Sequence, residues 1–123
     1  MAKILVVADD DWVAGNLATA VSDTEVELWM CSDPRRVVEA AQQTDFDLVM
    51  ADMQIGNMGG AAVVRELAAA AYTGELARIP VFLLVDRSAD RYLAKQAGAD
   101  GVLQKPFTAQ QLRNIFSSLA ATL

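Results

Sequence analysis

The sequence predicts an α/β protein with the flavodoxin-like (βα)5 arrangement, a doubly wound parallel sheet in a single domain. Short apolar runs alternate with segments of helical periodicity along the whole chain. Five strand–helix units in succession favour a parallel sheet covered by helices on both faces. The 123 residues, 54% of them hydrophobic and 21% charged, suffice for one well-packed core. We therefore expect residues 1–123 to form one domain.

The first two strand–helix units follow from local patterns. Residues 4–7 form an unbroken apolar run, as in a strand buried on both faces, and residues 13–21 repeat apolar side chains at helical spacing. Residues 26–30 alternate in polarity, which favours a strand at the sheet edge. The segment Ser32-Asp33-Pro34 then combines two capping residues with a proline suited to a first helical turn, so a second helix is expected to begin there.

The last three units have clear boundary signals. Pro80 precedes the most apolar run of the chain, Ser88 can cap a short helix that Gly98 would end, and the segment 108–111 reads as a capping box. We expect strands at residues 46–51, 81–85 and 101–103, with helices at 61–71, 88–97 and from 108 onward.

Composition excludes several classes of function. Without histidine, and with Cys31 as the single cysteine, the chain offers no Cys/His zinc site, no internal disulfide and no histidine base. The net charge of −6 argues against direct nucleic-acid binding. No segment resembles a signal peptide or a membrane helix. We expect a cytoplasmic chain that contacts neither nucleic acid nor membrane directly.

Acidic residues and one lysine follow the predicted strands where ligands bind in open α/β sheets, beyond the carboxyl ends of the strands. Asp9–Asp11 follow the first strand, Asp52 the third and Lys105 the fifth. Carboxylates with open positions suit Mg²⁺, and an aspartate can accept a phosphoryl group as an acyl phosphate. In this hypothesis Asp52 attacks, Asp9 and Asp10 help to hold the metal, and Lys105 pairs with the phosphoryl group.

Ordinary structural roles compete with these functional ones. A single aspartate at a strand end often caps a helix or lies in solvent. Asp11 fits the start of the first helix, where a carboxylate suits the free N–H groups. Asp47, before the main apolar run of the third strand, is expected to be structural.

Three segments together resemble the receiver domain of bacterial two-component response regulators. They are Lys3–Val7 with the acids after it, "DLVMADMQIGNMGG" at 47–60, and "GADGVLQKPF" at 98–107. The combination is specific, whereas either of the later two motifs alone would be weak. The resemblance implies a strand order of 2-1-3-4-5.

The resemblance also implies roles for individual residues. Asp52 matches the phosphoacceptor and Lys105 the invariant lysine, with a cis bond between Lys105 and Pro106. Mg²⁺ would be bound by Asp9, by Asp52 and by the backbone carbonyl of Gln54. The chain would not be an enzyme beyond self-phosphorylation and autodephosphorylation.

The resemblance implies partners as well. The phosphoryl donor would be a histidine kinase or a phosphotransfer protein, and the signal would pass to a downstream protein or output domain outside this sequence. A homodimer through the fourth and fifth helices is expected from relatives. The chain either acts alone or is a piece of a longer regulator or hybrid kinase.

Three positions depart from the family pattern. Ala8 replaces the first member of the usual acidic pair, which should weaken metal binding unless Asp10 substitutes. Val85 stands where the family has a Thr or Ser that bonds the phosphoryl group, and valine has no hydroxyl. Val102 replaces a switching aromatic residue. Asp86 directly follows Val85, and we expect it to approach Lys105 and to compete with a phosphoryl group.

Two alternatives stay open. The chain could be a pseudo-receiver that binds a protein partner without being phosphorylated, which the three departures favour. It could also be a small haloacid-dehalogenase-like phosphatase, since residues 9–13 fit a D-x-D-x-[TV] pattern with Asp9 as nucleophile and Asp11 as general acid. Those enzymes need a cap or a longer core, which fits poorly in 123 residues.

Overall fold

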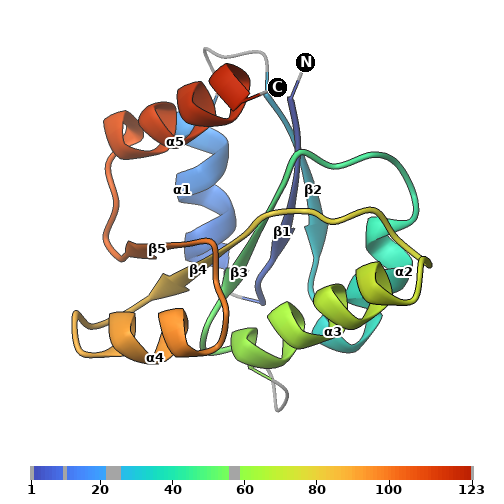
Figure 1. Cartoon of the computed structure of the whole chain (residues 1–123). Coiled ribbons are helices and arrows are strands. Elements are labelled where there is room, and N and C mark those ends of the chain that lie inside the picture. Colours follow the sequence, from blue (N-terminus) through green and yellow to red (C-terminus); the bar gives the residue numbers. More distant parts are fainter. Residues whose placement is uncertain (1, 10, 22–25, 56–58, 123) are drawn as a thin grey trace.

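The computed structural model describes residues 2–9, 11–21, 26–55 and 59–122, and Figure 1 shows a central sheet between two layers of helices. The strands are β1 (Ala2–Val7), β2 (Val26–Cys31), β3 (Leu48–Asp52), β4 (Val81–Val85) and β5 (Gly101–Gln104). The helices are α1 (Asp11–Val21), the 3-10 turn η1 (Pro34–Arg36), α2 (Val37–Ala41), α3 (Gly60–Tyr72), α4 (Asp90–Gln96) and α5 (Ala109–Thr122).

All strands of the sheet are parallel, and their order is β2-β1-β3-β4-β5. This confirms the predicted fold class and strand order. The half-buried β2 lies at one edge, as its alternating sequence predicts, whereas the central β3 is buried throughout. The strand order changes direction between β1 and β3, and their carboxyl ends lie side by side there because Val7 pairs with Ala51.

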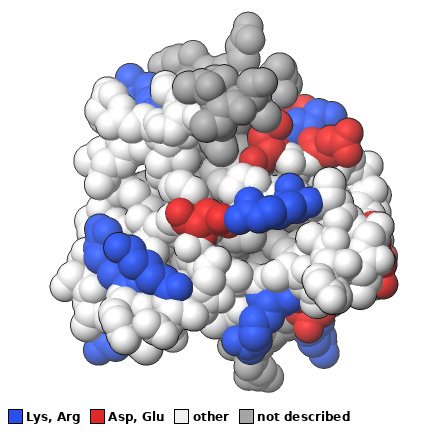
Figure 2. Space-filling model, viewed as in Figure 1, with Lys and Arg blue, Asp and Glu red and all other residues white. Residues whose placement is uncertain are grey.

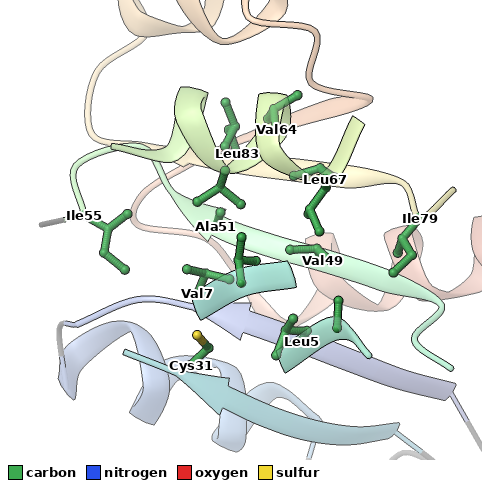
Figure 3. Close-up of a cluster of buried hydrophobic side chains, with 14 of the residues drawn as sticks. Leu5, Val7, Cys31, Val49, Ala51, Ile55, Val64, Leu67, Ile79 and Leu83 are labelled. Atoms are coloured by element: carbon green, nitrogen blue, oxygen red, sulfur yellow. The ribbon is translucent and has the colours of Figure 1, made fainter. Parts of the chain in front are cut away.

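The sheet has an apolar layer on each face, because side chains of a parallel strand alternate between two covered sides. On one face, side chains of β1, β3 and β4 meet those of α2, α3 and α4, and Figure 3 shows this layer around Val49, Leu67 and Leu83. On the other face, α1 and α5 cover a second cluster that includes Leu17, Met50 and Leu112. Figure 1 shows this division of the helices between the faces.

Two of the predicted helix starts are confirmed by their hydrogen bonds. The carboxylate of Asp33 accepts from the N–H of Arg35 at 3.0 Å, directly before Pro34. At α5, the Thr108 N–H donates to Gln111 Oε1 at 2.7 Å and the Gln111 N–H donates to Thr108 Oγ1 at 3.1 Å. These reciprocal bonds form the predicted capping box.

Several boundaries differ by a residue or two from those predicted, and the hydrogen bonds explain two of them. Strand β3 begins at Leu48 rather than at residue 46. The N–H of Asp47 donates to the carbonyl of Lys3 just before the first residue pair of β1 and β3. Helix α4 begins at Asp90, and Ser88 does not cap it. The Ser88 carbonyl instead accepts from the N–H of Arg91 in a preceding turn. Gly98, with a φ of +96°, follows the end of α4 as expected.

The described helices include none that is both long and apolar enough to span a membrane. The face drawn in Figure 2 carries its charged side chains in small groups, some with both signs and one, at the left, basic alone, with uncharged surface between them.

Candidate functional site

The carboxyl ends of β3 and β5 bring Asp52 and Lys105 together, although the two residues are 53 positions apart in sequence. Asp52 is the last residue of β3 and Lys105 directly follows β5. The Asp52 side chain is 4% exposed and that of Lys105 is 10% exposed. The strand register therefore buries a carboxylate and an ammonium against each other at the rim of the sheet.

Both oxygens of Asp52 have hydrogen-bond donors. Its Oδ2 accepts from Lys105 Nζ at 2.9 Å, and its Oδ1 accepts from the backbone N–H of Gln54 at 3.0 Å. A buried carboxylate is costly unless it is paired and hydrogen-bonded, and these two contacts offset that cost. Each of these carboxylate oxygens has a further lone pair that a cation or another donor could occupy.

Lys105 has a second carboxylate partner. Its Nζ lies 3.0 Å from Oδ1 of Asp86, whose side chain is 54% exposed. Burial by itself lowers the pKa of the Lys105 ammonium, but the hydrogen bonds to Asp52 and Asp86 outweigh it and raise the pKa above its ordinary value. The ammonium is thus held charged. The predicted approach of Asp86 to Lys105 is confirmed.

Backbone contacts place Lys105 at this rim. Its N–H donates to the carbonyl of Val85 at 2.8 Å, which continues the ladder between β4 and β5. The Lys105–Pro106 peptide bond is cis, as the resemblance implies. The next residue, Phe107, is buried in the layer under α1 and α5.

The glycine pair after β3 has a steric role that the sequence reasoning missed. A Cβ on Gly60 would lie 2.7 Å from the carbonyl oxygen of Asp52 and 2.8 Å from the Cα of Met53. Gly59 has a φ of +80°, which favours glycine. The first turn of α3 therefore approaches the backbone of Asp52 closely. Two adjacent glycines between a strand and a helix were the available signal.

The predicted metal ligands are only partly within the described residues. Asp9 is exposed just after β1, Asp52 is buried at the neighbouring strand end, and Asp10 lies outside the described residues. Among the residues that can be described, no three Asp, Glu, His or Cys side chains gather in one place. By donor type, the carboxylates of Asp9 and Asp52 and the carbonyl of Gln54 would offer Mg²⁺ the hard oxygen ligands that this ion requires.

The three positions that depart from the receiver pattern are occupied by packed apolar side chains. Ala8 is buried in the layer beneath α1 and α5, and its N–H donates to the carbonyl of Cys31 at 3.2 Å. Val85 is fully buried in the opposite layer, and Val102 packs against that layer half-buried. None of these side chains provides a ligand or a hydroxyl donor at the rim.

Comparison with known proteins agrees with this geometry. The family model of the response regulator receiver domain matches residues 4–117. Response regulator MprA of Mycolicibacterium vanbaalenii is 30% identical over 110 residues, which cover 89% of this chain and 46% of that protein. The chain spans about half the length of the curated relatives it matches.

Two solved structures extend the comparison. The signal receiver domain of a signal transduction histidine kinase from Syntrophus aciditrophicus is 26% identical, with a TM-score of 0.83 over 100% of this chain and 92% of that chain. The receiver domain of sensor histidine kinase PA1611 from Pseudomonas aeruginosa PAO1 is 21% identical, with a TM-score of 0.81 over 96% of each chain. That second structure holds a magnesium ion coordinated in its active-site cleft.

Proposed function

Because this chain belongs to the response regulator receiver domain family of two-component signalling, we propose that Asp52 accepts a phosphoryl group and that the protein-binding surface then changes. The observation that carries the proposal is the buried contact of 2.9 Å between Asp52 and Lys105. This contact holds a carboxylate and an ammonium side by side at one end of the sheet, which supports the proposed roles of nucleophile and of cation for phosphoryl oxygens.

The chemistry required of the chain is modest. An Asp52 oxygen attacks the phosphorus of the donor, the bond from phosphorus to the leaving group breaks, and the product is an acyl phosphate. Phosphoryl transfer is catalysed mainly by positioning and by electrostatic stabilisation. The Gln54 N–H orients the carboxylate through Oδ1, and Lys105 neutralises charge on the transferred group.

We assign the metal position to Asp9, Asp52 and the carbonyl of Gln54. Mg²⁺ held there would neutralise part of the negative charge of the phosphoryl oxygens. Ala8 supplies no carboxylate to this set, and Asp10 could replace the missing acid. We therefore propose weaker metal binding than in a receiver with two adjacent acids at this position.

Switching is proposed to be weak as well. The buried Val85 offers no hydroxyl to the phosphoryl group, and Val102 has no ring that could change position. Loss of one donor to a developing charge typically costs on the order of 10²-fold in rate. The expected behaviour is slow phosphorylation rather than none.

The partners follow from the family. We propose a histidine kinase or a phosphotransfer protein as phosphoryl donor, and a downstream protein or output domain as the recipient of the signal. A homodimer through α4 and α5 is a further proposal. The contact between this chain and each partner would form at the rim that holds Asp52 or on the α4 side of the sheet.

A pseudo-receiver remains the second candidate, and one observation favours it. Lys105 already has two carboxylate partners, so its charge is satisfied without any phosphoryl group. In that case the chain would bind its partner in a single state. The phosphatase alternative gains no such support, since within the described residues no ion pair or hydrogen bond joins Asp9 to another side chain.

The decisive experiment is incubation with acetyl phosphate and Mg²⁺, followed by intact-mass measurement. We expect a gain of one phosphoryl mass, with acetate released, that disappears in Asp52→Asn. Asp47→Asn is the matched control, because Asp47 lies at the opposite end of the same strand region. A wild-type chain that gains no mass at millimolar Mg²⁺ would establish the pseudo-receiver instead.

A further inference from the structure

The second carboxylate on Lys105 is unexplained by the proposed phosphoacceptor role. Asp52 and Asp86 contact the same Nζ at 2.9 Å and 3.0 Å, so one ammonium serves two anions. Asp52 is needed as the nucleophile. Asp86 has no such part, and it contacts the same Nζ that the proposed function assigns to the phosphoryl oxygens.

We propose that Asp86 is a displaceable internal anion, which occupies Lys105 until a phosphoryl or phosphate group takes its place. The regulatory meaning of this exchange rests on the proposed function of Asp52, whereas the competition itself does not. Asp86 would thereby set how tightly the site holds an external anion.

The exposure of the two carboxylates decides which one gives way. The Asp52 side chain is 4% exposed and holds a second bond from the Gln54 N–H, whereas the Asp86 side chain is 54% exposed. Exposed ion pairs are weak, because water competes for both partners. Displacement of Asp86 into solvent therefore costs little, and displacement of Asp52 would strand a buried charge.

The neighbouring Arg87 pairs chiefly with Asp90, and its charge interaction with Asp86 is weaker. Arg87 Nη2 lies 3.2 Å from Oδ1 of Asp90, a buried residue in the first turn of α4. In the described part of the chain, Lys105 is thus the cation that forms an ion pair with Asp86. An anion that takes Lys105 leaves Asp86 without this ion pair and repels it by like charge.

Through this repulsion, anion binding at Lys105 would change the position of α4 without a hydroxyl at position 85. Asp86 directly follows β4, and the turn after it leads to Asp90 at the start of α4. Movement of Asp86 away from an anion would pull on this turn. Expulsion of a carboxylate would take the place of attraction by a hydroxyl, which Val85 lacks.

The test compares wild type with Asp86→Asn and with Asp45→Asn, which removes the same charge from an exposed loop. Inorganic phosphate is titrated in the presence of Mg²⁺, and binding is followed by the NMR signals of the Lys105 side chain and of the backbone amides at residues 86–88. We expect Asp86→Asn to bind phosphate roughly three- to tenfold more tightly than wild type, the scale of a partly exposed ion pair. Asp45→Asn should match wild type.

Each outcome decides the proposal. Equal phosphate affinities for Asp86→Asn and Asp45→Asn would overturn it, and so would the absence of any saturable shift of Lys105 in all three proteins. The acetyl phosphate experiment is read separately by mass. No phosphorylation of any variant, together with tighter phosphate binding by Asp86→Asn, would reject the proposed function and retain the displaceable anion.

Discussion

Aspartates at the two ends of the sheet make different kinds of contact. At the amino end, Asp47 accepts from the backbone N–H of Lys3 in β1, and Asp100 accepts from the backbone N–H of Val81 in β4. At the carboxyl end, Asp52 and Asp86 share the ammonium of Lys105. A backbone N–H is fixed in place and neutral, whereas a lysine is mobile and charged. The first end can therefore be rigid, and the second can exchange partners.

The amino-end contacts are closely similar to each other. Asp47 Oδ2 accepts from the Lys3 N–H at 2.9 Å while the Asp47 N–H donates to the Lys3 carbonyl at 2.8 Å. Asp100 Oδ2 accepts from the Val81 N–H at 2.8 Å while its own N–H donates to the Val81 carbonyl at 2.8 Å. Each aspartate thus joins the segment that precedes its own strand to the first residues of an adjacent strand.

Lys105→Met should have the largest effect on stability. It leaves the buried carboxylate of Asp52 without a cation, and breaking a buried ion pair in this way costs about 3 kcal/mol of unfolding free energy. Urea unfolding measures the loss, with the exposed Lys95→Met as a control expected to stay near wild type. Asp52→Asn added to Lys105→Met should recover part of the loss. No recovery would mean that Asp52 is not the group left uncompensated.

Gly60→Ala should have the next largest effect, because the added methyl group meets backbone atoms of Asp52 and Met53 that cannot move aside easily. Overpacking of this kind costs about 2 kcal/mol. Gly15→Ala is the matched control, since a Cβ on Gly15 in α1 meets nothing within 4 Å. That variant should be slightly more stable than wild type. Equal thermal stabilities of the two variants would contradict the close approach of α3 to Asp52.

Asp100→Ala should cost about 1.5 kcal/mol and leave the carboxyl-end site intact. The substitution removes the acceptor of the Val81 N–H and the ion pair with Arg78. Thermal unfolding measures the loss, and acetyl phosphate reactivity of Asp52 should be unchanged. A slower phosphorylation would show that the two ends of the sheet are coupled.

The sequence predicted the fold well because the periodic patterns and end signals are local. The edge position of β2 and the capping box at Thr108 follow from short segments, whereas the strand order was implied by the family resemblance. The contact of Asp86 with Lys105 was expected only from its place after Val85, and its distance depends on the register of β4 with β5. The role of Gly60 was not predicted, because it depends on how closely α3 packs against β3. Asp10 lies outside the described residues, so its proposed metal role stays a prediction.

Alkaline pH should weaken the carboxyl end and spare the amino end. The pKa of Lys105 is raised, because its hydrogen bonds to Asp52 and Asp86 outweigh the effect of burial. A raised pKa means that the stabilisation is fully present below the unfolded-state value of about 10.4 and is lost as pH rises through the folded-state value. The difference in unfolding free energy between wild type and Lys105→Met should thus be constant to about pH 9.5 and shrink above about pH 10.4. If the difference in unfolding free energy between the two proteins stayed constant at all pH values, the charge of Lys105 would not contribute to stability.

Asp47→Asn should have the smallest effect and gives the sharpest contrast between the two ends. The amide oxygen of asparagine can still accept from the Lys3 N–H, so the unfolding free energy should change by less than about 0.5 kcal/mol. Asp52→Asn makes the same chemical change at the other end of the sheet and should abolish phosphorylation, since an amide is not a nucleophile of this kind. Asp47→Ala, which removes the acceptor, should be clearly less stable than Asp47→Asn. If Asp47→Asn were as unstable as Asp47→Ala, the amino end would also depend on charge, and the distinction between a structural and a reactive end would not hold.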